Sequence, residues 1–268
     1  MGLPTRAAVA AALLTASLGA HAAPVTFFGE DLGAGSASGL ARSFAAEAAF
    51  LAALDVRGTD SLEPWPADGS VSNLLFSGAG VIGMLSAPTL LRAAPFNARF
   101  AADGTKYLDT AFNRRISFSR PVDAFGLFVI DANERDNDPA VVTAGGQPLS
   151  PQDIDARPFD SVDGIFRIVT ERAPGVFELL FDGGRFPAPS GSGLFVGLVD
   201  AANPFTNIVL INGTSGLDTA FQDGFAYDRL SVGFVPAGGG TVPEPAAWGL
   251  LALAGLGAGL ARRQRSGA

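Results

Sequence analysis

The sequence has 268 residues, a formal net charge of −8, no cysteine and one histidine, His21. Without cysteine the chain forms no disulfide, and it has neither a cysteine nucleophile nor a zinc site with cysteine ligands. The acidic balance disfavours nucleic acid and anionic lipid as partners, because both are bound by positive charge.

The N-terminal segment has the three parts of a secretory signal peptide. Arg6 supplies a positive charge, Ala7 to Leu18 is apolar, and Ala20-His21-Ala22 fits a signal peptidase site. Residues 1–22 are therefore predicted to be removed on export. Because His21 leaves with them, the exported chain has no histidine for a Ser-His-Asp triad or a haem ligand.

One helix and many strands are expected in the exported part. Leu40 to Leu54 has apolar residues at three- and four-residue spacing and much alanine, which predicts an amphipathic helix. After it, short apolar runs alternate with turn residues, as in β-proteins. The predicted strands are Leu74 to Phe76, Val81 to Leu85, Arg115 to Ser119, Ala124 to Ile130, Ile165 to Thr170, Val176 to Phe181, Leu194 to Val199, Phe205 to Ile211 and Tyr227 to Phe234.

These elements predict an all-β fold for residues 23–237. Strands without intervening helices favour a two-sheet antiparallel sandwich of jelly-roll type, with one short N-terminal helix. A barrel is the alternative. Residues 23–240 contain 14 basic and 25 acidic side chains, so this stretch has a net charge of −11. Such a surface favours solubility and divalent cations.

The C-terminal residues form an ordered series of signals. A glycine-rich linker, residues 238–242, precedes Pro243-Glu244-Pro245, and an apolar run, residues 246–261, leads to three arginines. As a helix this run would span about 24 Å, shorter than the roughly 30 Å core of a bilayer. The arginines are expected on the cytoplasmic side, which places the rest of the chain outside.

This C-terminal layout resembles the PEP-CTERM sorting signal of Gram-negative bacteria that make extracellular polysaccharide. The resemblance covers Val242 to the C-terminus, with Pro243, Glu244 and Pro245 as its motif. It implies that residues 243–268 pass through the inner membrane transiently. It also implies that an exosortase-type transpeptidase is a partner and that the protein reaches the cell surface or extracellular matrix.

The body of the chain is similar to a class of PEP-CTERM surface proteins at three places: Val25 to Leu32, Pro121 to Ile130 and Asp223 to Asp228. That class resembles carbohydrate-binding jelly rolls in layout. The likeness implies a fold, and it does not by itself assign a ligand.

Four carboxylates near the first and last strands form a candidate calcium site. Glu30 and Asp31 end the first strand, while Asp223 and Asp228 flank the last. If the terminal strands are neighbours, these side chains would converge, and Ca²⁺ accepts six to eight oxygens in irregular geometry. Alternatively, they cap turns and are solvated.

Two further regions are candidate ligand contacts. Asp131, Asp136 and Asp138 lie in a dense acidic loop whose spacing does not match an EF-hand, so it is a solvated loop, a calcium loop or a sugar contact. Trp65 lies between two prolines, where it would stack on a sugar or cover the edge of the core.

The sequence therefore predicts a non-enzymatic surface protein associated with extracellular polysaccharide or adhesion, and no catalytic residue is assigned. Binding of acidic polymers is expected to need calcium, because the domain is itself acidic. Two other functions stay open: a glycan-active enzyme that uses two carboxylates, and a purely structural coat protein.

Overall fold

The computed structural model describes residues 24–110, 113–132, 166–183, 188–211 and 225–236. No helix within these ranges is both long and apolar enough to cross a membrane. The predicted signal peptide and the predicted sorting tail lie outside the described residues, so both stay predictions at the structural level.

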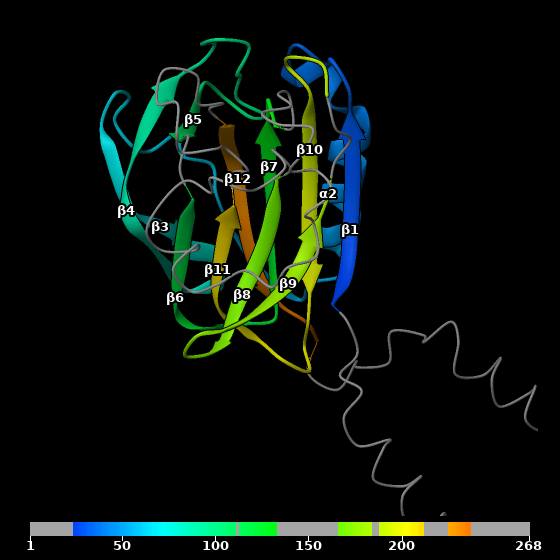
Figure 1. Cartoon of the computed structure of the whole chain (residues 1–268), viewed down its shortest axis with the longest axis vertical. Coiled ribbons are helices and arrows are strands. Elements are labelled where there is room, and N and C mark those ends of the chain that lie inside the picture. Colours follow the sequence, from blue (N-terminus) through cyan, green and yellow to red (C-terminus); the bar gives the residue numbers. More distant parts are fainter. Residues whose placement is uncertain (1–23, 111–112, 133–165, 184–187, 212–224, 237–268) are drawn as a thin grey trace, which may run out of the picture. The chain divides into compact units, whose positions relative to one another are not determined.

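The described residues form twelve strands, one α-helix and two short 3₁₀ helices (Figure 1). The helices are η1 (Ala37–Gly39), α2 (Ala41–Ala52) and η2 (Ser77–Ala79). The strands are β1 (Val25–Asp31), β2 (Val56–Asp60), β3 (Ser70–Phe76), β4 (Val81–Ala93), β5 (Lys106–Thr110), β6 (Arg114–Val122), β7 (Ala124–Ile130), β8 (Arg167–Ala173), β9 (Val176–Asp182), β10 (Gly193–Val199), β11 (Phe205–Ile211) and β12 (Phe225–Phe234).

All twelve strands belong to one antiparallel sheet. Its order is β1-β10-β7-β12-β5-β4-β6-β11-β8-β9, with β2 added to β12 and β3 added to β4. The sheet curls until its two end strands approach, and the rings of Phe28 in β1 and Phe181 in β9 are 5.4 Å apart between centroids (Figure 1). The architecture is mostly β and close to a barrel. The all-β prediction is thus confirmed, whereas the two-sheet jelly-roll description is not.

The nine strands predicted from apolar patterns and the helix are present, and β1 is the first strand that the resemblance implied. Most ends shift by at most four residues, but β4 continues to Ala93, eight residues beyond the predicted Leu85. Two strands were missed. Val56–Asp60 is polar and contains glycine, and Lys106–Thr110 has only two adjacent apolar residues. Both are recruited by neighbours: β2 pairs with β12, and β5 bridges β12 and β4.

The inner face of the curled sheet encloses the larger core. Phe125, Leu127 and Val129 of β7 point into it, as do apolar residues from most other strands. Phe166 anchors this core through ring contacts with Phe225 and Tyr227, at centroid distances of 6.3 and 6.1 Å. The first contact is edge-on and the second is tilted, and aromatic pairs of this kind add to the free energy gained from burial.

A second core lies between helix α2 and the outer face of β1, β10 and β7. Phe50 of α2 is fully buried there, above two glycines that pair with each other across β10 and β7. A Cβ atom at Gly197 would come within 2.5 Å of the Phe50 ring, and one at Gly126 within 2.9 Å. The glycines therefore make the space that the Phe50 ring occupies. β7 is buried along its whole length because cores cover both of its faces.

Candidate functional site

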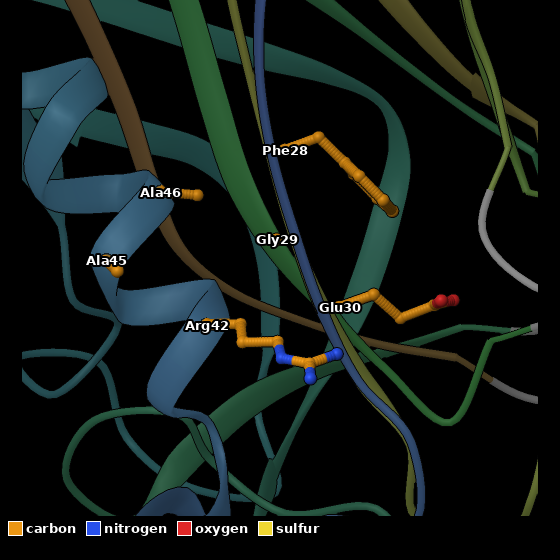
Figure 2. Close-up of a pocket in the computed structure, with 6 residues that line it drawn as sticks. All are labelled: Phe28, Gly29, Glu30, Arg42, Ala45 and Ala46. Atoms are coloured by element: carbon orange, nitrogen blue, oxygen red, sulfur yellow. The ribbon is translucent and has the colours of Figure 1, made fainter.

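A surface hollow lies along β1, beside helix α2. It is lined by Phe28, Gly29 and Glu30 of β1 and by Arg42, Ala45 and Ala46 of α2 (Figure 2). Figure 2 shows Arg42 reaching from α2 toward β1, whereas Phe28 and Glu30 leave the strand on its other side. The small alanine side chains keep the helix side of the hollow open.

The hollow occurs where it does because β1 is an end strand of the sheet. Within the described residues β1 pairs with β10 alone, so its other edge meets no further strand there. Helix α2 packs closely on β1, since a Cβ atom at Gly29 would lie 2.3 Å from the carbonyl oxygen of Arg42. This close approach sets Arg42 beside the strand.

Phe28 supplies an exposed aromatic surface to the hollow. Its side chain is 44% exposed although it belongs to a strand, and its ring is tilted against that of Phe181. Contact with Phe181 fixes the orientation of the ring. An aromatic surface held in this way can stack on the apolar face of a ligand at little cost in side-chain entropy.

Charged groups of both signs complete the lining. Among the arginines and the lysine that the structure describes, Arg42 is the one whose side chain has no ion pair or hydrogen bond. Its guanidinium thus offers up to five donors, and the Glu30 carboxylate offers acceptors. An aromatic ring together with a few polar groups can orient a ligand that lies on this surface.

Asp31, one of the predicted calcium ligands, caps helix α2. Its carboxylate accepts hydrogen bonds from the backbone N–H groups of Arg42 (3.1 Å) and Ser43 (2.9 Å) and from the Ser43 hydroxyl (2.8 Å). The residue before the helix, Leu40, has no side chain that can do this. Asp31 therefore satisfies the orphan donors of the first turn and faces the positive end of the helix dipole.

Asp228, another predicted ligand, is fully buried between β12 and the 101–104 loop. Its two oxygens accept hydrogen bonds from the backbone N–H groups of Asp103 (2.9 Å) and Arg229 (2.6 Å). Burial raises the pKa of Asp228 to about 8, although these hydrogen bonds act in the opposite direction.

The neighbouring Arg229 links three parts of the molecule. Its guanidinium contacts Glu47 of α2 at 2.8 Å and Asp103 at 2.6 Å. It leaves β12 at a break in the strand register, with a left-handed backbone φ of 45°. Burial raises the pKa of Glu47 even though Arg229 lowers it. This network holds the helix to the sheet.

The four predicted calcium ligands are not brought together among the described residues. β1 and β12 are separated by β10 and β7, which places Asp228 about 14 Å from β1 at the usual strand spacing. Asp223 lies outside the described residues. Within the described part of the chain, no group of three His, Cys, Asp or Glu is arranged to hold a metal ion. A calcium site at these four residues stays a prediction, but its premise of neighbouring terminal strands is wrong.

Trp65 packs against the edge of the inner core. Its indole N–H donates to Asp60 at 3.3 Å, and its carbonyl accepts from Lys106 at 2.7 Å. These contacts correspond to the alternative that the sequence left open, a tryptophan covering the core. Its use as a sugar platform stays a prediction.

The acidic loop is described only at its start. Asp131 is buried, has a positive φ of 66°, and accepts a hydrogen bond from the backbone N–H of Gly191 at 2.7 Å. Its carboxylate therefore helps to close the turn before β10. Asp136 and Asp138 lie outside the described residues, so their predicted role in binding is not tested.

Sequence reasoning found Glu30 but not Phe28 or Arg42 as its neighbours. Phe28 belongs to the run Val25–Asp31, which reads as an ordinary strand, and nothing local marks it as exposed. Arg42 becomes part of the hollow because α2 packs on β1. One signal was available, since Gly29 within an apolar strand marks close backbone approach.

The described part of the chain is a curled antiparallel β domain with one covering helix. Its surface has a hollow that combines an aromatic ring with charged groups. Residues 241–266 match the model of the PEP-CTERM protein-sorting motif, which confirms the resemblance of the C-terminal segment. The motif includes Pro243, Glu244 and Pro245. It indicates an exported surface protein that is held at a membrane and then processed by an exosortase. Neither the curated proteins nor the solved structures gave a match.

Proposed function

We propose that the exported domain is a non-enzymatic component of the cell surface that associates with extracellular polysaccharide. The sorting motif at residues 241–266 carries this proposal. The resemblance to the PEP-CTERM signal implies a bacterium that makes such polysaccharide. In this proposal signal peptidase removes residues 1–22, and the tail holds the chain in the inner membrane. An exosortase then acts at Pro243-Glu244-Pro245, and the domain joins the surface or matrix.

The hollow on β1 supports a sugar as its ligand. The exposed Phe28 ring suits the C–H face of a pyranose, while Arg42 and Glu30 supply donors and acceptors for hydroxyl groups. Figure 2 places these groups on either side of the strand edge, so a saccharide would lie across β1.

The lining also supports binding without turnover. Glycoside hydrolysis ordinarily uses two carboxyl groups about 5–10 Å apart, and Glu30 is the one carboxylate that lines the described hollow. For acidic polymers, calcium bridging stays part of the proposal, because residues 23–240 have a net charge of −11. Neutral polymers need no such bridge.

The test measures binding of the processed protein to dextran, a neutral polymer, and to polygalacturonate, an acidic one. Phe28→Ala is expected to weaken binding about fivefold, since stacking on one ring contributes about 1 kcal/mol. Phe96→Ala is the matched control, because Phe96 is 39% exposed and lies outside the hollow. Equal affinities for the wild type and Phe28→Ala would remove the hollow from the proposal, and release of reducing ends would make the protein an enzyme.

A further inference from the structure

Three large apolar side chains are exposed together on the outer face of the β3–β4 hairpin. Leu75, Ile82 and Met84 are 45%, 45% and 50% exposed. Leu75 is the direct cross-strand partner of Ile82, and Met84 follows two residues later on the same face of β4. We call these three residues the hairpin patch.

The hairpin tip next to this patch is joined to the end of β12. The Arg120 guanidinium lies 4.4 Å over the Phe234 ring and donates a hydrogen bond to the carbonyl of Ala79 in the tip. Phe234 pairs with Val56, which is itself 41% exposed. The patch and the last residues of β12 therefore lie at the same end of the domain.

The chain leaves the described domain at that end. Residue 236 follows β12, and the apolar run of the tail begins at residue 246. Ten residues span at most about 35 Å when fully extended. If the run is in a membrane, as the proposed function holds, this end of the domain stays within that distance of the lipid headgroups.

We propose that the hairpin patch contacts the membrane surface while the tail still holds the protein there. Apolar side chains enter the boundary between headgroups and acyl chains, and nearby cations are attracted to anionic lipid. Arg57 and Arg120, both exposed, lie beside the hairpin tip and supply these charges locally, although residues 23–240 as a whole have a net charge of −11. The tether gives the lipid surface a high effective concentration, which favours it over a second copy of the chain.

The absence of cysteine makes this contact measurable with single labels. Ile82→Cys and, as a control, Ser38→Cys would each be introduced into the full chain and labelled with an environment-sensitive fluorophore. Ser38 follows β1, whose last residue is in register with Ala226 near the start of β12, about 25 Å along that strand from Phe234. The labelled chains would be reconstituted in vesicles of phosphatidylethanolamine and phosphatidylglycerol.

Nitroxide-bearing lipid is expected to quench the fluorescence of the label at position 82 at least about twice as strongly as that of the label at position 38. Replacing Leu75 and Met84 with glutamate should abolish this difference. Equal quenching at both positions in chains that float with the vesicles would overturn the contact alone. Chains that do not float would overturn the membrane-held intermediate of the proposed function, and the contact with it. A fluorescence change at position 82 that grows with the protein density in the vesicles, but does not depend on the nitroxide, would assign the patch to contact with a second copy of the chain.

Discussion

Two regions of the sheet share the same antiparallel geometry but differ in how far their apolar side chains are buried: the strands beneath α2, and the β3–β4 hairpin. In β7 every residue from Ala124 to Ile130 is buried, because one face meets the inner core and the other meets the helix. In β3 the burial alternates, and the outer face exposes Leu75 beside Ile82. A continuous apolar run thus marks a strand covered twice, whereas exposed apolar residues in an alternating strand mark a surface without a cover among the described residues.

The largest expected difference in stability between these two regions comes from truncating one buried aromatic side chain. Phe50→Ala removes the ring that fills the space above Gly126 and Gly197, and we expect it to lower the free energy of unfolding by about 3–5 kcal/mol. Ile82→Ala, in the exposed hairpin patch, should change it by less than about 0.5 kcal/mol. Urea unfolding of both variants measures the difference. Similar losses in the two variants would mean that the patch is covered in solution.

The same contrast explains how much of the fold the sequence could predict. Composition and periodicity were enough for α2 and nine strands, because each has its own apolar pattern. β2 and β5 lack such a pattern and become strands through pairing with β12 and β4. The order of the strands depends on contacts between distant residues, so the separation of β1 from β12 was not visible.

The site was less predictable than the fold for a related reason. Glu47 and Arg229 are 182 positions apart, and their ion pair exists because α2 packs near β12. Asp31 reads as an acidic residue after a strand, and its capping role appears only when the helix begins beside it. The C-terminal sorting motif, by contrast, is a linear signal, so the sequence alone identified it.

Stability of the helix-covered region should depend on pH through Asp228. Its folded pKa is about 8, above the ordinary value of 3.8, so the folded state binds a proton that the unfolded state has released. Stability is therefore expected to fall as the pH rises from about 4 to about 8. Each pKa unit corresponds to about 1.4 kcal/mol, so we expect a total loss of several kcal/mol over this range.

Asp228→Asn provides the control, because an amide does not titrate. Its free energy of unfolding should change less between pH 5 and pH 9 than that of the wild type, measured by urea unfolding at each pH. Glu47, whose pKa burial also raises, is present in both proteins, so its contribution cancels in the comparison. Parallel pH profiles for the two proteins would show that Asp228 is ionised in the folded state at neutral pH.

The smallest expected effect tests whether Asp31 acts as a helix cap or as a calcium ligand. Asp31→Ala removes the acceptor for the N–H groups of Arg42 and Ser43, and loss of a helix cap costs about 1 kcal/mol. Because a cap needs no metal, this loss should be the same in millimolar calcium and in chelator. A calcium site would behave otherwise: calcium would raise the melting temperature of the wild type and not that of the variant, since binding to the folded state alone stabilises it.

Glu30→Gln, next along the same strand, is the matched control, because it removes a predicted calcium ligand and leaves the cap in place. If calcium stabilises the wild type and neither variant, the calcium site is restored. If only Asp31→Ala loses stability, and by the same amount with and without calcium, Asp31 acts as the cap of α2.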